Sequence, residues 1–363
     1  MYKIKNCLIY NEDSNDVIKN IESNSIDLIL TDPPYELGNF RKKIGEWEKS
    51  KITESGIFKE CLRILKPGGH LVCFSSNRTM YKFGSSIENS GFEIRNTLIW
   101  EYKQSIPRNM DIGKAIDCQI IYGKTSSKYM KQIEQEYGGA SYKIKGTNNT
   151  MFGDKTEFER KEYENITSEG RKWNGWGTNL APSFEPIIVA RKPFSGSLAL
   201  NILNNENGGL NIERLKEYNC GKFPSNVLNF EKEKRDDYNN HPMVKPTELL
   251  KYLIFMFTNE DSTIFDPFMG SGSTGIGVLQ SGENRKFIGI ELDEKYYEIA
   301  KDRIRYVREK YSGHSILGDF CIELKGKNKV IGSIAINGYK EKNEGEIEIG
   351  YALNTAFQGN GYM

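Results

Sequence analysis

The stretch IDLILTDPPY at residues 26–35 decides the fold. Its first six residues are mostly apolar, a run of the length expected for one buried β-strand. Two prolines follow at once, and proline cannot donate a hydrogen bond to a neighbouring strand, so the strand must end there. It therefore delivers Asp32 to its carboxyl end, which is where open α/β sheets place their active sites.

Strand and helix patterns alternate on both sides of this stretch. Apolar residues at helical spacing predict a helix over residues 55–66, ended by the turn KPGG at 66–69 and followed by a strand at 70–74. Further along, the pattern predicts these elements: a helix at 247–257, a strand at 263–265, a helix ending near Leu279, a strand at 286–291 and a helix at 296–310. Such alternation is typical of an α/β fold built on a parallel sheet.

Two regions break the alternation. Residues 101–240 are rich in Gly, Asn, Lys, Glu and aromatic residues and keep one clear strand, at 184–190, so we expect a functional insertion there. After residue 313, three segments alternate like antiparallel strands: 320–324, 330–336 and 346–353. Turns are expected at Lys325-Gly326 and at residues 343–345.

A second candidate site is the stretch FDPFMGSGST at residues 265–274, which reads as a strand, a turn and the start of a helix. Gly270 and Gly272 would let the backbone approach a ligand closely, and the free amides at the helix start would face it. Glu291 ends the next strand, where a carboxylate can accept hydrogen bonds from ribose hydroxyls. An ordinary tight turn with a solvated acid is the alternative. The combination favours an adenosine-bearing cofactor without saying which one.

The DPPY loop suits methylation of an exocyclic amine. The amine lone pair is delocalised into the base ring, and the Asp32 carboxylate with a backbone carbonyl could accept its two N–H bonds. Tyr35 would offer a flat face to an extruded base. A proline-rich turn with a helix-capping Asp is the alternative. Attack on cytosine carbon-5 by a cysteine is disfavoured, because no cysteine here follows a proline.

Together these segments resemble the DNA amino-methyltransferases that form N6-methyladenine or N4-methylcytosine, over residues 1–311. The order of catalytic loop, variable region and cofactor motif is similar to the beta group of that family. FEPI at 184–187 and ARKP at 190–193 are similar to phage and prophage members. Other matching motifs are LKPGG at 65–69, HPMVKPT at 241–247 and FIGIELD at 287–293.

The resemblance implies a Rossmann-like methyltransferase sheet that uses S-adenosyl-L-methionine. Its catalytic residues would be Asp32, Pro33, Pro34 and Tyr35. Contacts to S-adenosylmethionine would come from Asp266, Phe268, Gly270, Gly272, Ser273 and Glu291, with Lys245 and Thr247 beside its methionine end.

The implied methyltransferase domain is 1–312, with a catalytic part at 1–100, a target-recognition insert at about 101–240 and a cofactor part at 241–312. The implied substrate is double-stranded DNA. Asp32 favours N6 of adenine, since the family's N4-cytosine enzymes often carry Ser there. N4-cytosine methylation and a non-catalytic DNA-binding protein remain alternatives. A cognate restriction enzyme, and the choice between monomer and homodimer, stay open.

Residues 313–363 resemble the middle of a GCN5-related N-acetyltransferase, through segments 330–334, 348–353 and 358–363. That family's coenzyme A-binding loop and helix would begin at the last of these, and the sequence stops at Met363. We therefore expect an incomplete α+β appendage or fusion remnant rather than a working acetyltransferase.

Composition narrows the remaining classes. Six scattered cysteines and three histidines give no metal-ligand spacing, so no metal is expected. Apolar runs are too short to cross a membrane and no secretory segment is expected, which favours the cytoplasm. A net charge of +1 neither supports nor excludes DNA. The candidate phosphate contacts, each equally readable as a solvated loop, are Arg41-Lys42-Lys43, Arg171-Lys172 and Arg191-Lys192.

Overall fold

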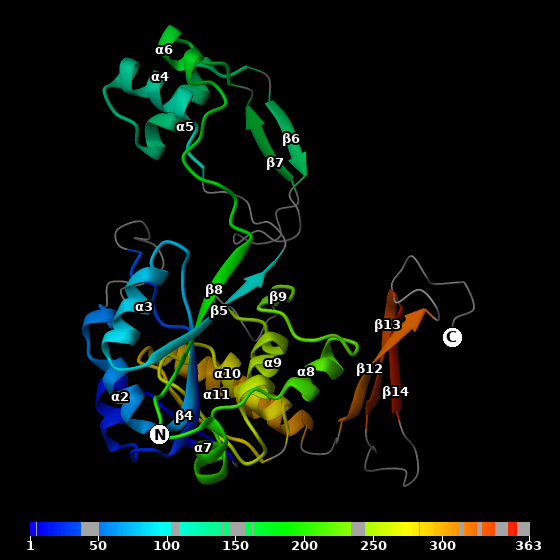
Figure 1. Ribbon diagram of the computed structural model, residues 1–363. Helices are drawn as coiled ribbons and strands as arrows, with labels where there is room; N and C mark the ends of the chain where they lie inside the picture. The colour runs from blue at the N-terminus through cyan, green and yellow to red at the C-terminus, as the bar shows by residue number, and fades with distance from the viewer. Residues whose placement is uncertain are drawn as a thin grey trace. The chain divides into compact units, whose positions relative to one another are not determined.

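A nine-stranded mixed sheet forms the centre of the larger of two compact units (Figure 1). The larger unit comprises Met1–Tyr102 and Phe184–Met363, and the smaller one comprises Lys103–Ser183. The computed structural model describes residues 1–4, 6–37, 51–102, 109–139, 141–145, 157–161, 163–233, 244–282, 284–311, 316–324, 329–337 and 348–353.

The strands of the large sheet lie in the order β1-β2-β11-β10-β3-β4-β8-β5-β9. In that order their bounds are Tyr2–Ile4, Cys7–Tyr10, Lys286–Ile290, Thr263–Asp266, Ile26–Thr31, Leu65–Phe74, Phe184–Arg191, Glu93–Glu101 and Val227–Asn229. The strand expected before the DPPY loop and both strands around the glycine turn are thus confirmed as neighbours at the middle of one sheet.

The sheet is parallel from β2 to β4, but β8 runs antiparallel to both β4 and β5. The expectation of a purely parallel sheet is therefore wrong at this strand. Since β5 runs parallel to β4, β5 ends and β8 begins at the same edge of the sheet as Asp32. Register confirms this, because Trp100 near the end of β5 pairs with Glu185 near the start of β8.

Helices cover both faces of the sheet. All six residues of β3 are buried, because Leu28 and Leu30 face one core and Ile29 faces the other; this is the pattern of a strand covered on both sides. The first core is closed by α9 (Thr247–Phe257), α10 (Ser273–Gln280) and α11 (Glu294–Tyr311). The second is closed by α1 (Ser14–Val17), α2 (Ile57–Ile64) and α3 (Met80–Asn89), with 3-10 turns at Ile18–Asn20 and Ile52–Glu54.

The KPGG turn lies inside β4 instead of before it. Leu65 pairs with Ile26 and His70 pairs with Leu28, so the four residues between them bulge out of the ladder. Gly68 has φ +80, and a Cβ there would come within 2.3 Å of the Asn201 amide. The turn was predicted from the sequence, but the strand that continues through it was not.

The expected insert of 101–240 is longer than the unit that the structure separates. Residues from 184 onward belong to the larger unit, because β8 is a central strand of its sheet, and α7 (Leu198–Asn205) and α8 (Ile212–Tyr218) pack against β4 and α9. The smaller unit contains α4 (Ile112–Tyr122), α5 (Ser127–Tyr137), α6 (Ser168–Lys172) and the hairpin β6 (Ser141–Lys145) with β7 (Glu157–Lys161).

The expected antiparallel strands near the end of the chain are confirmed. They are β12 (Ile316–Leu324), β13 (Lys329–Asn337) and β14 (Glu348–Leu353), paired in that order. The turns at 325–326 and 343–345, and the segment 358–363, lie outside the described residues. None of the described helices is long and apolar enough to cross a membrane.

We expect Asp27→Ala to lower the free energy of unfolding by about 2–3 kcal/mol, because it leaves buried donors unpaired. The Asp27 carboxylate is 8% exposed and accepts hydrogen bonds from Lys66 Nζ (2.7 Å) and the Thr263 amide (2.7 Å), which ties β3 to β4 and β10. Urea unfolding measures the change. The exposed Asp302→Ala is the matched control, expected within about 0.5 kcal/mol of wild type; an equal effect of both variants would contradict the assignment.

Candidate active site

The DPPY loop leaves the sheet directly after β3, and its tyrosine folds back on its aspartate. The Tyr35 hydroxyl donates to Asp32 Oδ1 at 2.6 Å and lies 3.1 Å from Glu185 Oε2. Burial raises the pKa of Tyr35 well above its usual value, and the charges of Asp32 and Glu185 raise it further. The hydroxyl therefore stays protonated and acts as a fixed donor.

Lys245 completes the cluster around Asp32. Its ammonium lies 2.5 Å from Asp32 Oδ2 and 3.3 Å from Glu185 Oε2, and its side chain is only 6% exposed. Burial lowers the pKa of Lys245, but the two carboxylates outweigh this and leave that pKa raised. The cluster thus holds two carboxylates, one ammonium and one phenol hydroxyl at the carboxyl end of β3.

The ring of Tyr35 is less open than expected. Tyr35 is 6% exposed, and Lys245 Nζ lies 5.4 Å from its ring centroid and 5.1 Å from that of Phe74. A flat face for an extruded base is covered in this structure by the lysine. Pro33 and Pro34 lie between Asp32 and Tyr35, as the sequence requires.

The glycine turn lies beside this cluster and is joined to it by one buried hydrogen bond. Thr31, the residue before Asp32, donates to Asp266 Oδ1 at 2.8 Å. Asp266 also accepts from Thr274 (2.7 Å) and from the amide of Phe268 (3.0 Å), and it is 2% exposed. Its carboxylate is committed to shaping the loop, so we assign it a positioning role.

Gly270 and Gly272 both have positive φ, +54 and +80. At Gly272 a Cβ would lie 3.0 Å from the Cβ of Ala300 on α11, so close packing of this helix also favours a glycine here. Ser273 and Ser271 both receive hydrogen bonds from Arg303 on the same helix.

Glu291 follows β11 and keeps its predicted place beside the turn. One carboxylate oxygen accepts from the Gly270 amide (3.0 Å) and the other from the Asp293 amide (2.8 Å). Burial raises the pKa of Glu291, although these amide hydrogen bonds oppose the shift. Each oxygen has a further lone pair for a ligand hydroxyl, and the start of α10 carries no side-chain cap. The turn therefore fits a ligand with hydroxyls at one end and a carboxylate at the other.

A family model described as DNA methylase matches residues 26–302, which is most of the chain and includes both loops. The chain belongs to this DNA methylase family.

Among similar curated proteins is the Type II methyltransferase M.HindIII of Haemophilus influenzae, 27% identical over 339 residues, covering 82% of this chain and 94% of that protein. The DNA adenine methyltransferase YhdJ of Escherichia coli is 26% identical over 304 residues and covers 82% of each chain. Among solved structures, the cytosine-N4-specific PvuII DNA methyltransferase matches with a TM-score of 0.50 at 17% identity, covering 86% of this chain and 93% of that one. The last likeness supports the Rossmann-like methyltransferase fold.

Several basic residues of the methylase that were candidates for contact with DNA phosphates bond to other groups of the same chain. Arg191 pairs with Glu93 at 2.6 Å, and Lys192 donates to the carbonyl of Leu65 at 2.8 Å. Arg171 donates to backbone carbonyls at residues 165 and 166. Arg171 remains exposed despite these bonds, and for all three residues the choice between DNA contact and a solvated loop stays a prediction. Residues 41–43 lie outside the described residues.

Two other expected site residues of the methylase take unexpected places. Lys245, predicted beside the methionine end of the cofactor, contacts Asp32. The Thr247 amide donates to Glu233 at 2.8 Å and begins α9. Glu185 was missed as a site residue, although an acid directly before proline at the start of a buried strand was a usable signal.

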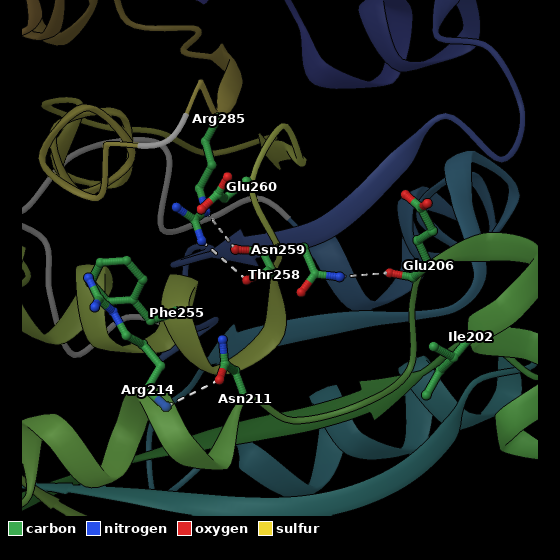
Figure 2. Close-up of a pocket in the computed structure, with 9 residues that line it drawn as sticks. All are labelled: Ile202, Glu206, Asn211, Arg214, Phe255, Thr258, Asn259, Glu260 and Arg285. Carbon is green, nitrogen blue, oxygen red and sulfur yellow. Dashed lines mark hydrogen bonds between the residues drawn. The ribbon is translucent and has the colours of Figure 1, made fainter.

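A cavity of about 550 Å³ in the methylase lies away from this site (Figure 2). Its lining includes Thr258 and Arg285, which precede β10 and β11, so it lies at the amino ends of the strands while Asp32 lies at the carboxyl ends. Arg285 donates to the hydroxyl and carbonyl of Thr258 and packs on Phe255, together with Arg214. These contacts connect α8, α9 and the start of β11 at this end of the sheet. The described residues contain no cluster suited to a metal ion.

We expect Asp266→Asn to remove a pH dependence of stability. Burial raises the pKa of Asp266 to about 7, despite the hydrogen bonds that lower it. The folded protein thus binds this proton more tightly than the unfolded chain. The contribution of the protonated carboxyl to the free energy of unfolding is therefore complete at low pH and is lost as the pH rises through about 7.

Between pH 5 and pH 7 the unfolding free energy of Asp266→Asn relative to wild type should therefore rise by about 2 kcal/mol, measured by urea unfolding. The exposed Asp302→Asn should follow wild type throughout. A flat difference between Asp266→Asn and wild type would show that Asp266 is already ionised at pH 5.

Proposed function

We propose that the chain is a site-specific DNA methyltransferase that transfers a methyl group from S-adenosylmethionine to N6 of an adenine flipped out of duplex DNA. The observation that carries this proposal is the Asp32 carboxylate, which lies at the end of β3 one hydrogen bond from the glycine turn through Thr31 and Asp266. A base acceptor and a cofactor-binding turn are thereby fixed on adjacent strands.

The residues around Asp32 suit attack by an aromatic amine. Bound S-adenosylmethionine supplies an electrophilic methyl group. An N–H bond donated to Asp32 draws the amine nitrogen away from conjugation with its ring, and the carboxylate stabilises the positive charge that develops on that nitrogen. The two prolines and the Tyr35 hydrogen bond hold the carboxylate in place beforehand. Asp32 is also the nearest acceptor for the proton that the methylated amine must lose.

The glycine turn would hold the cofactor through a few groups. Glu291 has acceptor capacity for ribose hydroxyls, and the uncapped start of α10 attracts the methionine carboxylate. Phe268 offers a partly exposed apolar face. The turn is shaped by Asp266, Gly270, Gly272 and Ser273. Lys245 and Thr247 act from the other side of the site, where Lys245 binds Asp32.

Adenine is preferred over cytosine because the loop begins with Asp and because a similar protein is named an adenine methyltransferase. N4-cytosine methylation is the second candidate, favoured by the PvuII enzyme's structural likeness. The order of the two loops supports membership of the beta group of the family, and the FEPI and ARKP segments support a phage-like origin.

We further propose the smaller unit, 103–183, as the target-recognition region, acting in the cytoplasm on double-stranded DNA.

M.HindIII is named a Type II methyltransferase, so a companion restriction enzyme is part of this proposal. The strands β12–β14 are proposed as a non-catalytic appendage with an acetyltransferase-like strand pattern.

With tritium-labelled S-adenosylmethionine, we expect the wild-type chain to label unmethylated plasmid DNA. Asp32→Ala should slow the labelling by about 10²–10³-fold, the cost of removing one preorganised electrostatic contact. Asp302→Ala should label at the wild-type rate. Label in protein rather than DNA, or undiminished labelling by Asp32→Ala, would contradict the proposal.

Two exposed tryptophans in the smaller unit are candidates for DNA contact. Trp173 is 39% and Trp176 60% exposed, and their rings meet edge to face at 4.9 Å beside the exposed Lys172. Stacking of one base on an aromatic side chain is worth about 1–3 kcal/mol. We therefore expect Trp176→Ala to weaken duplex binding by about 10-fold in a fluorescence anisotropy titration. The similarly exposed Tyr306→Ala is the control, and equal affinities for all three proteins would exclude this surface.

A further inference from the structure

The proposed chemistry needs Asp32 as an acceptor, yet both of its carboxylate oxygens are engaged. Tyr35 donates to Oδ1 and Lys245 donates to Oδ2. The Lys245 bond joins two charged groups, and such bonds are about twice as strong as those of neutral donors. A neutral amine therefore competes poorly for Asp32 while Lys245 stays in place.

The charge of Lys245 also opposes the reaction at this position. Positive charge develops on the amine nitrogen as the methyl group is transferred, and an ammonium on the same carboxylate repels it. The lysine lies over the rings of Tyr35 and Phe74 as well, where an extruded base would otherwise find aromatic contacts. Lys245 thus occupies the place of an amine donor above an aromatic surface.

A second acceptor for Lys245 lies within reach. Glu185 Oε2 is 3.3 Å from the ammonium, so a shift of roughly half an ångström gives a normal hydrogen bond. Glu185 is held by the pairing of β8 with β5, and its side chain is 17% exposed. The Tyr35 hydroxyl oxygen also lies 3.1 Å from Glu185 Oε2, but its single proton is donated to Asp32.

We propose that the target amine displaces Lys245 from Asp32 and that Glu185 receives the displaced ammonium. Glu185 is then a positioning residue for methyl transfer, and Lys245 is a placeholder that stays paired with Asp32 until a base arrives. This inference rests on the proposed function, because it names the residue that frees the acceptor for the amine.

A double-mutant cycle on the single-turnover methylation rate tests the exchange. Glu185→Gln keeps the shape of the side chain but weakens the second acceptor, and we expect about a 30-fold slower rate with affinity for S-adenosylmethionine within 2-fold of wild type. Adding Lys245→Met removes the blocking ammonium, so the double variant should be at least 3-fold faster than Glu185→Gln. If the rate losses of the two single variants multiply in the double variant, Glu185 and Lys245 support the site independently and the proposal fails.

Glu93→Gln is the matched control. Glu93 is a carboxylate on the same strand pair at its opposite end, where it binds Arg191. We expect this variant to methylate at the wild-type rate, and a comparable slowing would attribute the Glu185→Gln effect to the strands rather than to the exchange.

A crystal structure of the Asp32→Asn variant separates this inference from the proposed function, because it requires no turnover. With the charge on residue 32 removed, Lys245 Nζ should lie within about 3.0 Å of a Glu185 carboxylate oxygen, as in a normal charge-assisted bond. A lysine that stays on the side chain of residue 32 would overturn the exchange even if wild type methylates DNA. Absence of methyl transfer by wild type would instead refute the proposed function.

Discussion

The charge-assisted hydrogen bond between Lys245 and Asp32 ties together the elements around the site. Asp32 follows a strand buried on both faces, Lys245 precedes the buried helix α9, and Glu185 reaches both from the reversed strand β8. The ammonium of Lys245 is only 6% exposed and needs a partner, since an unpaired buried charge is strongly destabilising. The protein supplies a partner that the reaction itself must displace.

The two loops of the site are coupled through neighbouring strands. β3 and β10 pair in parallel, so the residues that follow them emerge at one edge, and the bond from Thr31 to Asp266 fixes their distance. Catalysis by positioning depends on such rigidity, because misplacing reacting groups by an ångström is costly. The glycines of the turn serve the same end, since Gly272 lets α11 pack closely behind it.

Much of the fold could be read from the sequence, because apolar runs with clear ends define β3, β10 and β11, and helical periodicity gives α9 with its observed bounds. The reversed direction of β8 could not, because it depends on pairing with Cys73 and Thr97, which lie far away in the sequence. The position of Glu185 beside Asp32 depends on the same pairing, although the acid before a proline at the start of this strand was a usable signal. Asp32 and Glu291 were placed correctly from their positions at strand ends.

The central claim, that Asp32 directs a methyl group to the exocyclic amine of adenine, is tested most directly by the product. The chain should be expressed in a host without DNA methylation of its own, and the DNA sequenced by a method that reads modified bases. We expect N6-methyladenine within one recurring sequence, and unmodified DNA when the Asp32→Ala variant is expressed. N4-methylcytosine without N6-methyladenine would contradict it.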